Sequence, residues 1–484
     1  MAITFLFCLL AGRFFYVQVV WSGQLGYRAL DQWMREIPVV AERGLITDRN
    51  GVVLAENDTS YTVFARSNAV KDKEETARLL ADCLGVDGEK LLDKLESVKA
   101  SEITVARHVD KSAIETLAEA GPDGVYYSRD NTRVYPKGDA LCQVLGFTST
   151  DNSGTTGIEK YYDKYLAGTN GELLYETDLV GINLEGAVAA YLPAENGMNI
   201  ELTVDYGIQS ICESVLKKVA ETYSPVSAEC IVLDPNTFEI LALANYPSYD
   251  LNEVPRDDTE LLNMLSRNRI VCDIYEPGST FKIVTAAADI EESLQGNPNA
   301  FSTSYVFSSS RTRTVDGTTV KCWSNHANGK HCNQTLADAL NNSCNPCFTD
   351  IALSLGKETF YDYLSAFGFG KATGIDYSGE AIGMLLPESA VRDCDLARIG
   401  FGQTVAVSGL QLACATAARP PDPETHHWQK HRRMHSLRHH RRHGRDARRN
   451  GPAHRSRTRL PRHPHPHRRR GTLRRTARFT SSYL

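Results

Sequence analysis

The sequence has no apolar run long enough to cross a membrane on its own. Its most hydrophobic stretch, residues 1–12, stops at Arg13, whereas a transmembrane helix needs about 20 consecutive apolar residues. No basic residue precedes this stretch, so it also lacks the charged beginning of a secretory signal peptide. The composition therefore excludes both a complete span and an ordinary signal peptide in these residues.

The last part of the chain lacks the residues from which a hydrophobic core is built. Residues 419–484 contain no Ile, Val or Cys, but they hold 11 of the 14 histidines and 20 Lys and Arg against 3 Asp and Glu. Their formal charge of +17 leaves −23 for residues 1–418 out of the total of −6. Because such a segment cannot bury enough apolar surface to fold, we expect this basic tail to be disordered.

Three explanations of the basic tail compete. A nucleic-acid-binding arm would have the charge, but the tail has few aromatic side chains for stacking and no periodicity. A metal-binding tract would have the histidines, but here they lack regular spacing. Translation of GC-rich DNA in a shifted reading frame explains both the abrupt change in composition and the excess of Arg over Lys. We favour this last explanation and expect no nucleic-acid partner.

Tight cysteine pairs are also scarce, although the chain has 12 cysteines. The densest group combines cysteines and histidines: Cys322, Cys332, Cys344 and Cys347, with His326 and His331. The spacing Cys344-x-x-Cys347 is that of one half of a zinc site, but no second pair of this kind completes it. Disulfides or free thiols are the simpler interpretations, and we expect no metal or other cofactor.

One segment carries a recognisable nucleophile. Residues 275–282 read YEPGSTFK, and an Ala-rich, apolar run follows them. Pro277 and Gly278 predict a turn, and the run after them predicts a helix. Ser279 and Lys282 then lie on one helix face, where an amine can take the hydroxyl proton and the helix dipole favours an alkoxide. S-x-x-K is the acyl-enzyme motif of penicillin-binding proteins and serine β-lactamases.

The same spacing occurs twice more, at residues 214–217 and 354–357. In the first copy Ser214 is predicted to point away from a buried helix stripe, which consists of Ile208, Ile211, Val215 and Val219. In the second copy Gly356 closes a helix and no turn precedes Ser354. We interpret both as solvated helix positions.

A second motif supports Ser279. The triplet Ser343-Cys344-Asn345 begins 64 residues after it and follows a predicted helix at 335–342. A hydroxyl at Ser343 can relay a proton to a leaving amine, and the Asn345 amide can hold both Lys282 and a substrate carbonyl. Because S-x-N also occurs at residues 266–268, the order and spacing of the two motifs carry the argument.

With these two motifs the chain resembles the class B penicillin-binding proteins of the division or sporulation type. The resemblance runs from Arg13 to about Ala418. It includes, in order, RGLITDRNG at 43–51, RVYP at 133–136, LGF at 145–147, GIE at 157–159, LTVD at 202–205 and GFGQ at 400–403. It implies an α/β fold class in which an elongated α+β pedestal carries a transpeptidase domain, an antiparallel sheet flanked by helices.

The resemblance also divides the chain into four segments. They are a partial transmembrane anchor at 1–21, a pedestal of the dimerisation type at 22–199, an incomplete transpeptidase domain at 200–418 and the basic tail at 419–484. In the pedestal, strands are expected at 52–55 and 61–65 with a turn at Asn57-Asp58 between them. A structural ion-pair network rather than a catalytic site is expected from Arg43, Asp48, Arg133 and Glu159.

The implied function is that of a peptidoglycan D,D-transpeptidase, a single-pass protein of the bacterial cell membrane with an extracytoplasmic catalytic domain. By resemblance, Ser279 attacks the carbonyl between two terminal D-Ala residues of a stem peptide. The resemblance gives Lys282 the role of base, Ser343 that of proton shuttle and Asn345 that of substrate orientation. It further implies β-lactam antibiotics as ligands and a membrane glycan polymerase as a candidate partner.

One part of the family pattern is absent, because the sequence contains no Lys-Thr-Gly or Lys-Ser-Gly triplet. In the family this triplet lies on a strand that follows the helix expected at 408–413, and that strand supplies one oxyanion-hole donor. A catalytically impaired scaffold that holds a glycan-polymerising partner is therefore an alternative. A β-lactamase or a penicillin-sensing receptor would share the S-x-x-K chemistry, but a pedestal spanning 22–199 argues against both.

Overall fold

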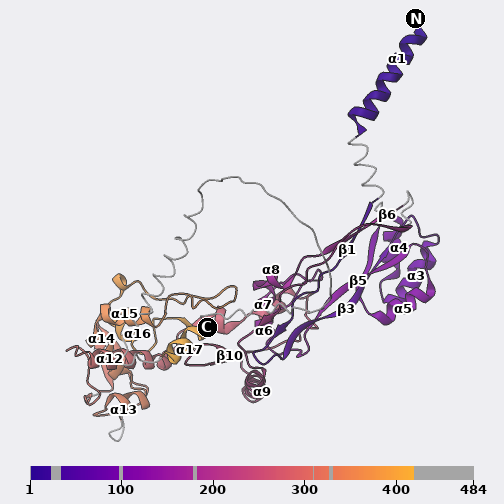
Figure 1. The fold of residues 1–484 in the computed structure, drawn as a ribbon. Helices are drawn as coiled ribbons and strands as arrows, with labels where there is room; N and C mark the ends of the chain where they lie inside the picture. The colour runs from indigo at the N-terminus through magenta and orange to yellow at the C-terminus, as the bar shows by residue number, and fades with distance from the viewer. Residues whose placement is uncertain are drawn as a thin grey trace, which may run out of the picture.

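The computed structural model describes residues 2–22, 34–97, 102–177, 183–308, 310–325 and 331–418. The basic tail and His326 lie outside these residues. Figure 1 shows an elongated molecule, with helices α12 to α16 at one end and the helices α3 to α5 of the pedestal at the other. The N-terminal helix α1 (Ala2–Phe15) lies beyond the pedestal end (Figure 1).

The N-terminal segment is helical but short. α1 is followed by a π-helical turn, Tyr16–Val20. Among the described parts of the chain, no helix combines the length and apolarity that a membrane crossing requires.

The pedestal is built on a five-stranded sheet in which β3 is central. Its strands are β2 (Ile46–Thr47), β3 (Val53–Ala65), β4 (Ile103–Val109), β5 (Val125–Val134) and β8 (Ile200–Glu201). All pairings are antiparallel except that of β2 with β8. Buried side chains of β3 pack against three helices, α3 (Lys73–Leu84), α4 (Gly88–Ser97) and α5 (Lys111–Ala120). A separate antiparallel sheet consists of β1 (Met34–Val39), β6 (Gly171–Thr177) and β7 (Asn183–Leu192).

The turn expected at Asn57-Asp58 is wrong, because β3 runs through it without a break. Asn57 pairs with Arg133 on β5, and its side chain donates to the Arg43 carbonyl at 2.5 Å. The Arg133 guanidinium donates back to Asn57 Oδ1 at 3.2 Å. These partners satisfy the polar side chain inside the strand, so the residue type that usually marks a turn is held in extended conformation.

The expected ion-pair network forms, but it includes Asp163 and does not include Asp48. Glu159 is fully buried and accepts from Arg43 Nε and Arg133 Nε, each at 2.7 Å. Arg43 also contacts Asp163 at 2.7 Å, a residue that the sequence did not single out. The buried Asp48 has another role, since its carboxylate accepts backbone N–H groups, including that of Tyr206.

The transpeptidase part begins with α9 (Tyr206–Tyr223) and the antiparallel pair β9 (Ala228–Leu233) and β10 (Ile240–Tyr246). Short elements follow: α10 (Thr259–Ser266), α11 (Arg269–Cys272), and β11 (Ile274–Tyr275), which pairs with β14 (Val407–Ser408). The main core surrounds α12 (Lys282–Leu294) and contains side chains of α13 (Leu336–Asn341), α14 (Asn345–Leu355), α15 (Lys357–Ala366), α16 (Asp393–Ile399) and α17 (Gly409–Ala417). The hairpin of β12 (Thr312–Val315) and β13 (Thr318–Lys321) packs beside α14.

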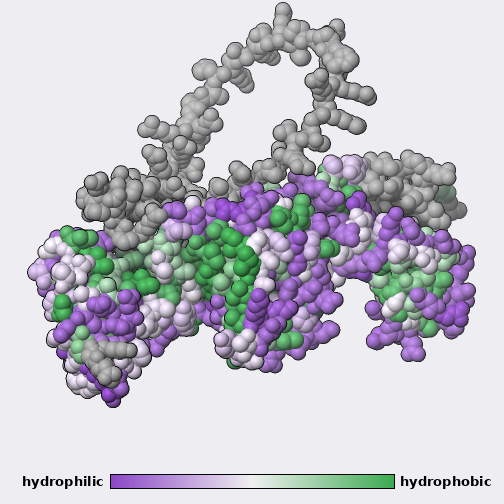
Figure 2. Space-filling model, turned by 90° about the horizontal axis from the view of Figure 1, so that it is seen from below, coloured by the Kyte–Doolittle hydropathy of each residue, from purple (hydrophilic) through white to green (hydrophobic). Residues whose placement is uncertain are grey.

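The buried stripe predicted for α9 is wrong at two of its four positions, since Ile208 and Val219 are half-buried but Ile211 is 66% and Val215 50% exposed. The helix instead packs Cys212 and Leu216 against β10. Both faces of the helix are apolar, so periodicity alone does not identify the inward one. Figure 2 shows a hydrophobic patch in the middle of the molecule, where Figure 1 places α9 and β10.

Candidate active site

Ser279 lies on a tight turn that the preceding residues enforce. Gly278 has φ +56°, and residues Gly278–Phe281 form a 3-10 turn that leads directly into α12. The Gly278 N–H donates to the carbonyl of Gly402 at 2.8 Å. A Cβ atom at Gly402 would come within 2.0 Å of the Gly278 oxygen, so this close approach requires a glycine. The GFGQ segment thus supports the turn that carries Ser279.

Four polar side chains meet at the start of α12. Lys282 Nζ lies 3.2 Å from Ser279 Oγ, 2.9 Å from Ser343 Oγ and 2.7 Å from Asn345 Oδ1. Ser343 Oγ lies 2.8 Å from Ser279 Oγ. The structure therefore brings together all four residues that the two sequence motifs singled out.

The Lys282 side chain is fully buried, although its amine is surrounded by polar atoms. Burial lowers the pKa of Lys282 to about 8, because the charged ammonium loses its hydration. The amine also lies 5.4 Å from the centre of the Phe348 ring. With this pKa about a tenth of the amine is neutral at a pH of about 7, and the neutral amine is the form that can accept a proton from a serine hydroxyl.

Ser343 and Asn345 reach the site from the junction of two helices. Ser343 follows α13 with φ +50°, a left-handed conformation that is uncommon for a serine. Asn345 opens α14, and its Nδ2 donates to the Lys321 carbonyl at the end of β13 at 3.1 Å. With one amide atom on Lys282 and the other on the backbone, Asn345 is fixed in orientation.

The rival motifs do not assemble a similar site. Ser214 is exposed on α9, as expected. Ser354 lies in the last turn of α14, where its hydroxyl donates to the Asn299 carbonyl at 2.5 Å, so it is not simply solvated. Ser266 ends α10, and Asn268 is buried before α11. Among the three S-x-x-K serines, which all lie in described residues, only Ser279 is hydrogen-bonded to its own lysine and to a second serine.

Two neighbours of the site were not predicted to lie beside it. Phe348 lies three residues after Asn345, and only the helical register of α14 places its ring near Lys282. Behind the motif triplet lie buried thiols and an imidazole, those of Cys322, His331, Cys344 and Cys347. A hydrogen bond with the Cys347 thiol, more than any other contribution, lowers the pKa of Cys344.

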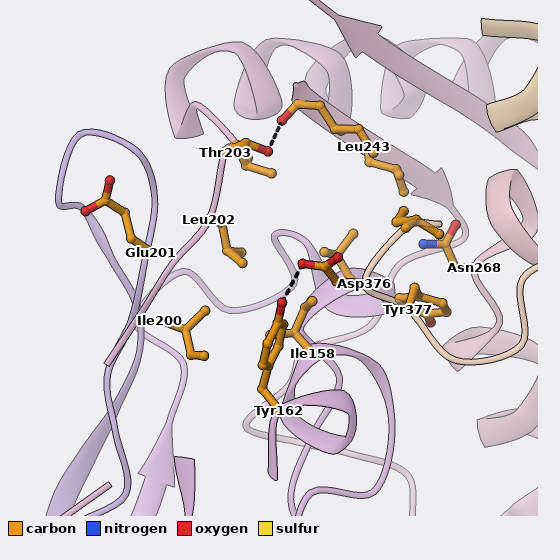
Figure 3. A pocket seen from close by; sticks show the side chains of 14 residues that line it. Ile158, Tyr162, Ile200, Glu201, Leu202, Thr203, Leu243, Asn268, Asp376 and Tyr377 are labelled. Atoms are coloured by element: carbon orange, nitrogen blue, oxygen red, sulfur yellow. Dashed lines mark hydrogen bonds between the residues drawn. The ribbon is translucent and has the colours of Figure 1, made fainter. Parts of the chain in front are cut away.

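A cavity of about 90 Å³ lies elsewhere, between the pedestal and the transpeptidase part. Figure 3 shows the Tyr162 hydroxyl and the Asp376 carboxylate pointing at each other across its edge, where they are hydrogen-bonded. Its lining is mostly apolar and includes Ile158, Ile200 and Leu202. The lining includes none of the four residues of the candidate active site, so the cavity belongs to the domain junction.

Comparison with known proteins gives two family matches. The family described as "Penicillin binding protein transpeptidase domain" matches residues 229–418. The family described as "Penicillin-binding Protein dimerisation domain" matches residues 38–202.

Individual relatives agree with these matches. The chain is 36% identical to stage V sporulation protein D of Bacillus subtilis over 415 residues, which cover 85% of this chain and 62% of that protein. It is 30% identical to the probable peptidoglycan D,D-transpeptidase PenA of Neisseria gonorrhoeae over 432 residues, 87% of this chain and 70% of that one. The crystal structure of penicillin binding protein 2X from Streptococcus thermophilus is similar with a TM-score of 0.61 at 26% identity, covering 79% of this chain and 59% of that one. The chain thus spans less than two thirds of the Bacillus relative.

Proposed function

The chain belongs to the class B penicillin-binding proteins, and on this premise we propose that it is a peptidoglycan D,D-transpeptidase with Ser279 as its nucleophile. The observation that carries the proposal is the contact of Ser279 with a buried lysine whose pKa is lowered to about 8. A serine hydroxyl becomes a nucleophile only when a base in hydrogen-bond reach can take its proton.

The proposed reaction has two halves. In the first, neutral Lys282 takes the hydroxyl proton while Ser279 Oγ attacks the carbonyl between the two terminal D-Ala residues. Ser343, 2.8 Å from Ser279 Oγ and 2.9 Å from Lys282 Nζ, passes the proton to the departing D-Ala amine. In the second, an amine of a neighbouring stem peptide attacks the acyl-enzyme, loses a proton to the same groups and restores Ser279.

The neighbouring groups support this assignment of roles. Asn345 holds Lys282 at 2.7 Å and is in position to orient a substrate carbonyl. The N-terminal end of α12 favours negative charge that develops at Ser279. β-Lactams, as mimics of the D-Ala-D-Ala end, would acylate the same hydroxyl.

We also propose that α1 is part of a membrane anchor and that the catalytic part is extracytoplasmic. The support is geometric, since α1 lies at the pedestal end and the candidate active site at the opposite end (Figure 1). The pedestal then holds the site away from the membrane, where stem peptides of the wall are accessible. A membrane glycan polymerase is the expected partner.

A second candidate function is that of an impaired scaffold. The observation that favours it is the absence of a Lys-Thr-Gly or Lys-Ser-Gly triplet, so one oxyanion donor of the family has no counterpart in the sequence. Fluorescent penicillin separates the two functions, because only a competent Ser279 becomes covalently labelled.

The experiment uses a chimera in which the C-terminal part of the Bacillus relative replaces residues 419–484. We expect Ser279→Ala to abolish covalent labelling, because Ser279 is the S-x-x-K serine that is hydrogen-bonded to its own lysine, and Ser343, which also contacts Lys282, has the role of proton shuttle. Ser214→Ala and Ser354→Ala are the matched controls, since each removes a serine of the same S-x-x-K spacing and should leave labelling unchanged. Residual covalent labelling of the Ser279→Ala chimera would refute the assignment.

A further inference from the structure

Three thiols and one imidazole converge directly behind the candidate active site. Cys322 follows strand β13, His331 belongs to the next described segment, and Cys344 and Cys347 lie at the start of α14. Their exposed fractions are 4%, 5%, 0% and 1%, respectively. Four soft or borderline ligand atoms are thus collected in the interior from three separate segments.

Three of these four ligand atoms are separated by distances typical of a metal site. One ligand atom each of Cys322, His331 and Cys344 lie within 4.8 Å of one another, and Cys322 Sγ is 3.5 Å from His331 Nδ1. In a tetrahedral zinc site with bonds of about 2.3 Å to sulfur and about 2.0 Å to nitrogen, a sulfur and a nitrogen ligand are about 3.5 Å apart. Two sulfur ligands are about 3.8 Å apart in the same geometry. Only small side-chain movements separate the observed cluster from such a site.

Cys347 is the candidate fourth ligand, although its sulfur is not part of the group of three ligand atoms that lie within 4.8 Å of one another. It lies three residues after Cys344 in the first turn of α14, and the two thiols interact with each other. Gln334 Nε2 reaches Cys347 Sγ at 3.8 Å and the His331 backbone carbonyl at 2.7 Å, so one amide holds the Cys347 side chain and the backbone that carries His331. A second shell of this kind is typical of metal ligands.

We propose that Cys322, His331, Cys344 and Cys347 bind a structural zinc ion. Thiolates and imidazole are ligands that Zn²⁺ prefers, and four protein ligands in a buried cluster leave no position for a catalytic water. Binding replaces the protons of the three thiols with the metal, so those protons are released. The sequence alone favoured free thiols or disulfides, because Cys322 and His331 are nine residues apart and do not form a tight second pair.

The zinc ion would affect catalysis by fixing the backbone that carries Ser343 and Asn345. Cys344 lies between Ser343 and Asn345, so a bond from its sulfur to a metal fixes the peptide units that carry both side chains. Ser343 holds a left-handed conformation, which persists only when the surrounding structure imposes it. The four ligands tie this residue to the β12–β13 hairpin and to α14 at once, and they are positioning residues rather than catalytic ones.

The first test measures the metal directly. The full chain is purified with a thiol reductant, loaded with Zn²⁺ and desalted, and its zinc content is determined by mass spectrometry. We expect a single zinc ion per chain, lost in Cys322→Ser and in His331→Ala. Cys394→Ser is the matched control, because Cys394 is a buried thiol of the same domain outside the cluster and its loss should leave zinc content unchanged. No bound zinc, or unchanged zinc in both ligand variants, would overturn the proposal.

A second measurement covers the case in which the ligand variants fail to fold. Co²⁺ replaces Zn²⁺ in the unmodified chain, and we expect the visible absorption of tetrahedral cobalt bound to thiolates. An octahedral spectrum without thiolate bands, or a Cys322–Cys344 disulfide in peptide mapping of the metal-loaded chain, would count against the site. Neither measurement requires acylation of Ser279, so the outcome is independent of the proposed transpeptidase activity.

Discussion

Lys282 shows at the scale of one residue how burial prepares a base. Water is removed from its amine, and the remaining contacts with Ser343 and Asn345 do not restore its usual proton affinity. The pKa of about 8 places the change between charged and neutral amine close to physiological pH. Reactivity of Ser279 should therefore depend on pH in a predictable direction.

We predict that the rate of penicillin acylation in the chimera rises with pH and levels off above about 8, since only the neutral amine accepts the proton. Stopped-flow or gel-based labelling measures the profile from about pH 6, about two units below the Lys282 pKa of about 8, to about pH 9.5, about 1.5 units above it. Lys282→Arg keeps the positive charge but has no neutral form in this range, so acylation should fall about 10²–10⁴-fold. A pH-independent rate would rule out Lys282 as the base.

The four motif residues could be found from the sequence because their chemistry depends on spacing along a helix and on the order of the motifs. Ser279 and Lys282 are separated by one turn, which periodicity predicts directly. The Phe348 ring and the thiol–imidazole cluster were not found as parts of the site, because the register of α14 places the ring and the packing of hairpin 312–321 against α14 places Cys322. No local pattern in the sequence reports that packing.

At the scale of elements, one buried carboxylate holds the pedestal segments together. Glu159 on α7 (Gly157–Tyr161) joins Arg43, before β2, to Arg133 on β5. Its removal would leave two guanidinium groups buried with a single remaining acidic neighbour, Asp163.

We predict that Glu159→Gln lowers the stability of the pedestal by about 3–5 kcal/mol, the usual effect of breaking a buried ion pair from one side. The midpoint of urea denaturation, followed by fluorescence, measures the change. Glu239→Gln is the control, because Glu239 forms an exposed pair with Arg49 at 3.2 Å and should cost no more than about 1 kcal/mol. Equal effects of the two substitutions would show that the buried network does not stabilise the pedestal.

Helix α12 contains a second buried carboxylate whose effect on stability has the opposite sign. Asp289 is fully buried, with Oδ1 accepting the Phe301 N–H at 2.9 Å, and burial raises its pKa to about 6. The folded state therefore holds a proton that the unfolded state, with an ordinary pKa of 3.8, releases between these two values. Stability falls as pH rises through this window, and the loss persists above it.

Asp289→Asn should remove this pH dependence and raise stability at neutral pH by about 1 kcal/mol, because a neutral amide replaces a buried charge. Melting temperatures recorded from about pH 4, near the lower end of this window, to about pH 7.5, about 1.5 units above its upper end, test the prediction. The same slope in the variant and the original chain would contradict it.

Elements themselves were predicted with uneven success, and the failures have physical causes. The helix expected at 335–342 forms as α13, and the Thr335 side chain caps its first turn by accepting the Asp338 N–H. The turn predicted within β3 does not form, because tertiary hydrogen bonds outweigh the turn preference of Asn57. The prediction of which face of α9 is buried was partly wrong, because the helix carries apolar side chains on two sides.

At the scale of the whole molecule, the transpeptidase part shows apolar surface and an open strand edge on one side. Within the described residues β9 pairs only with β10, and an exposed strand edge is prone to association. Nearby, Val226 is 90% and Tyr223 76% exposed, in addition to the outer face of α9. A further strand and a helix would cover these surfaces, but the composition of residues 419–484 is not that of a strand or an amphipathic helix.

We predict that another reading frame of the DNA encoding residues 419–484 specifies a Lys-Thr-Gly or Lys-Ser-Gly strand. The chain as written then lacks one oxyanion donor, a loss that typically costs about 10²–10³ in rate, and it also lacks the strand that would pair with β9. It should label poorly or not at all with fluorescent penicillin, and limited proteolysis should cleave it after Ala418. Sequencing of the coding DNA and labelling of the in-frame product measure both parts. A tail that resists protease and places a Lys or Arg beside Ser343 would instead identify a divergent enzyme with its own substitute for the missing triplet.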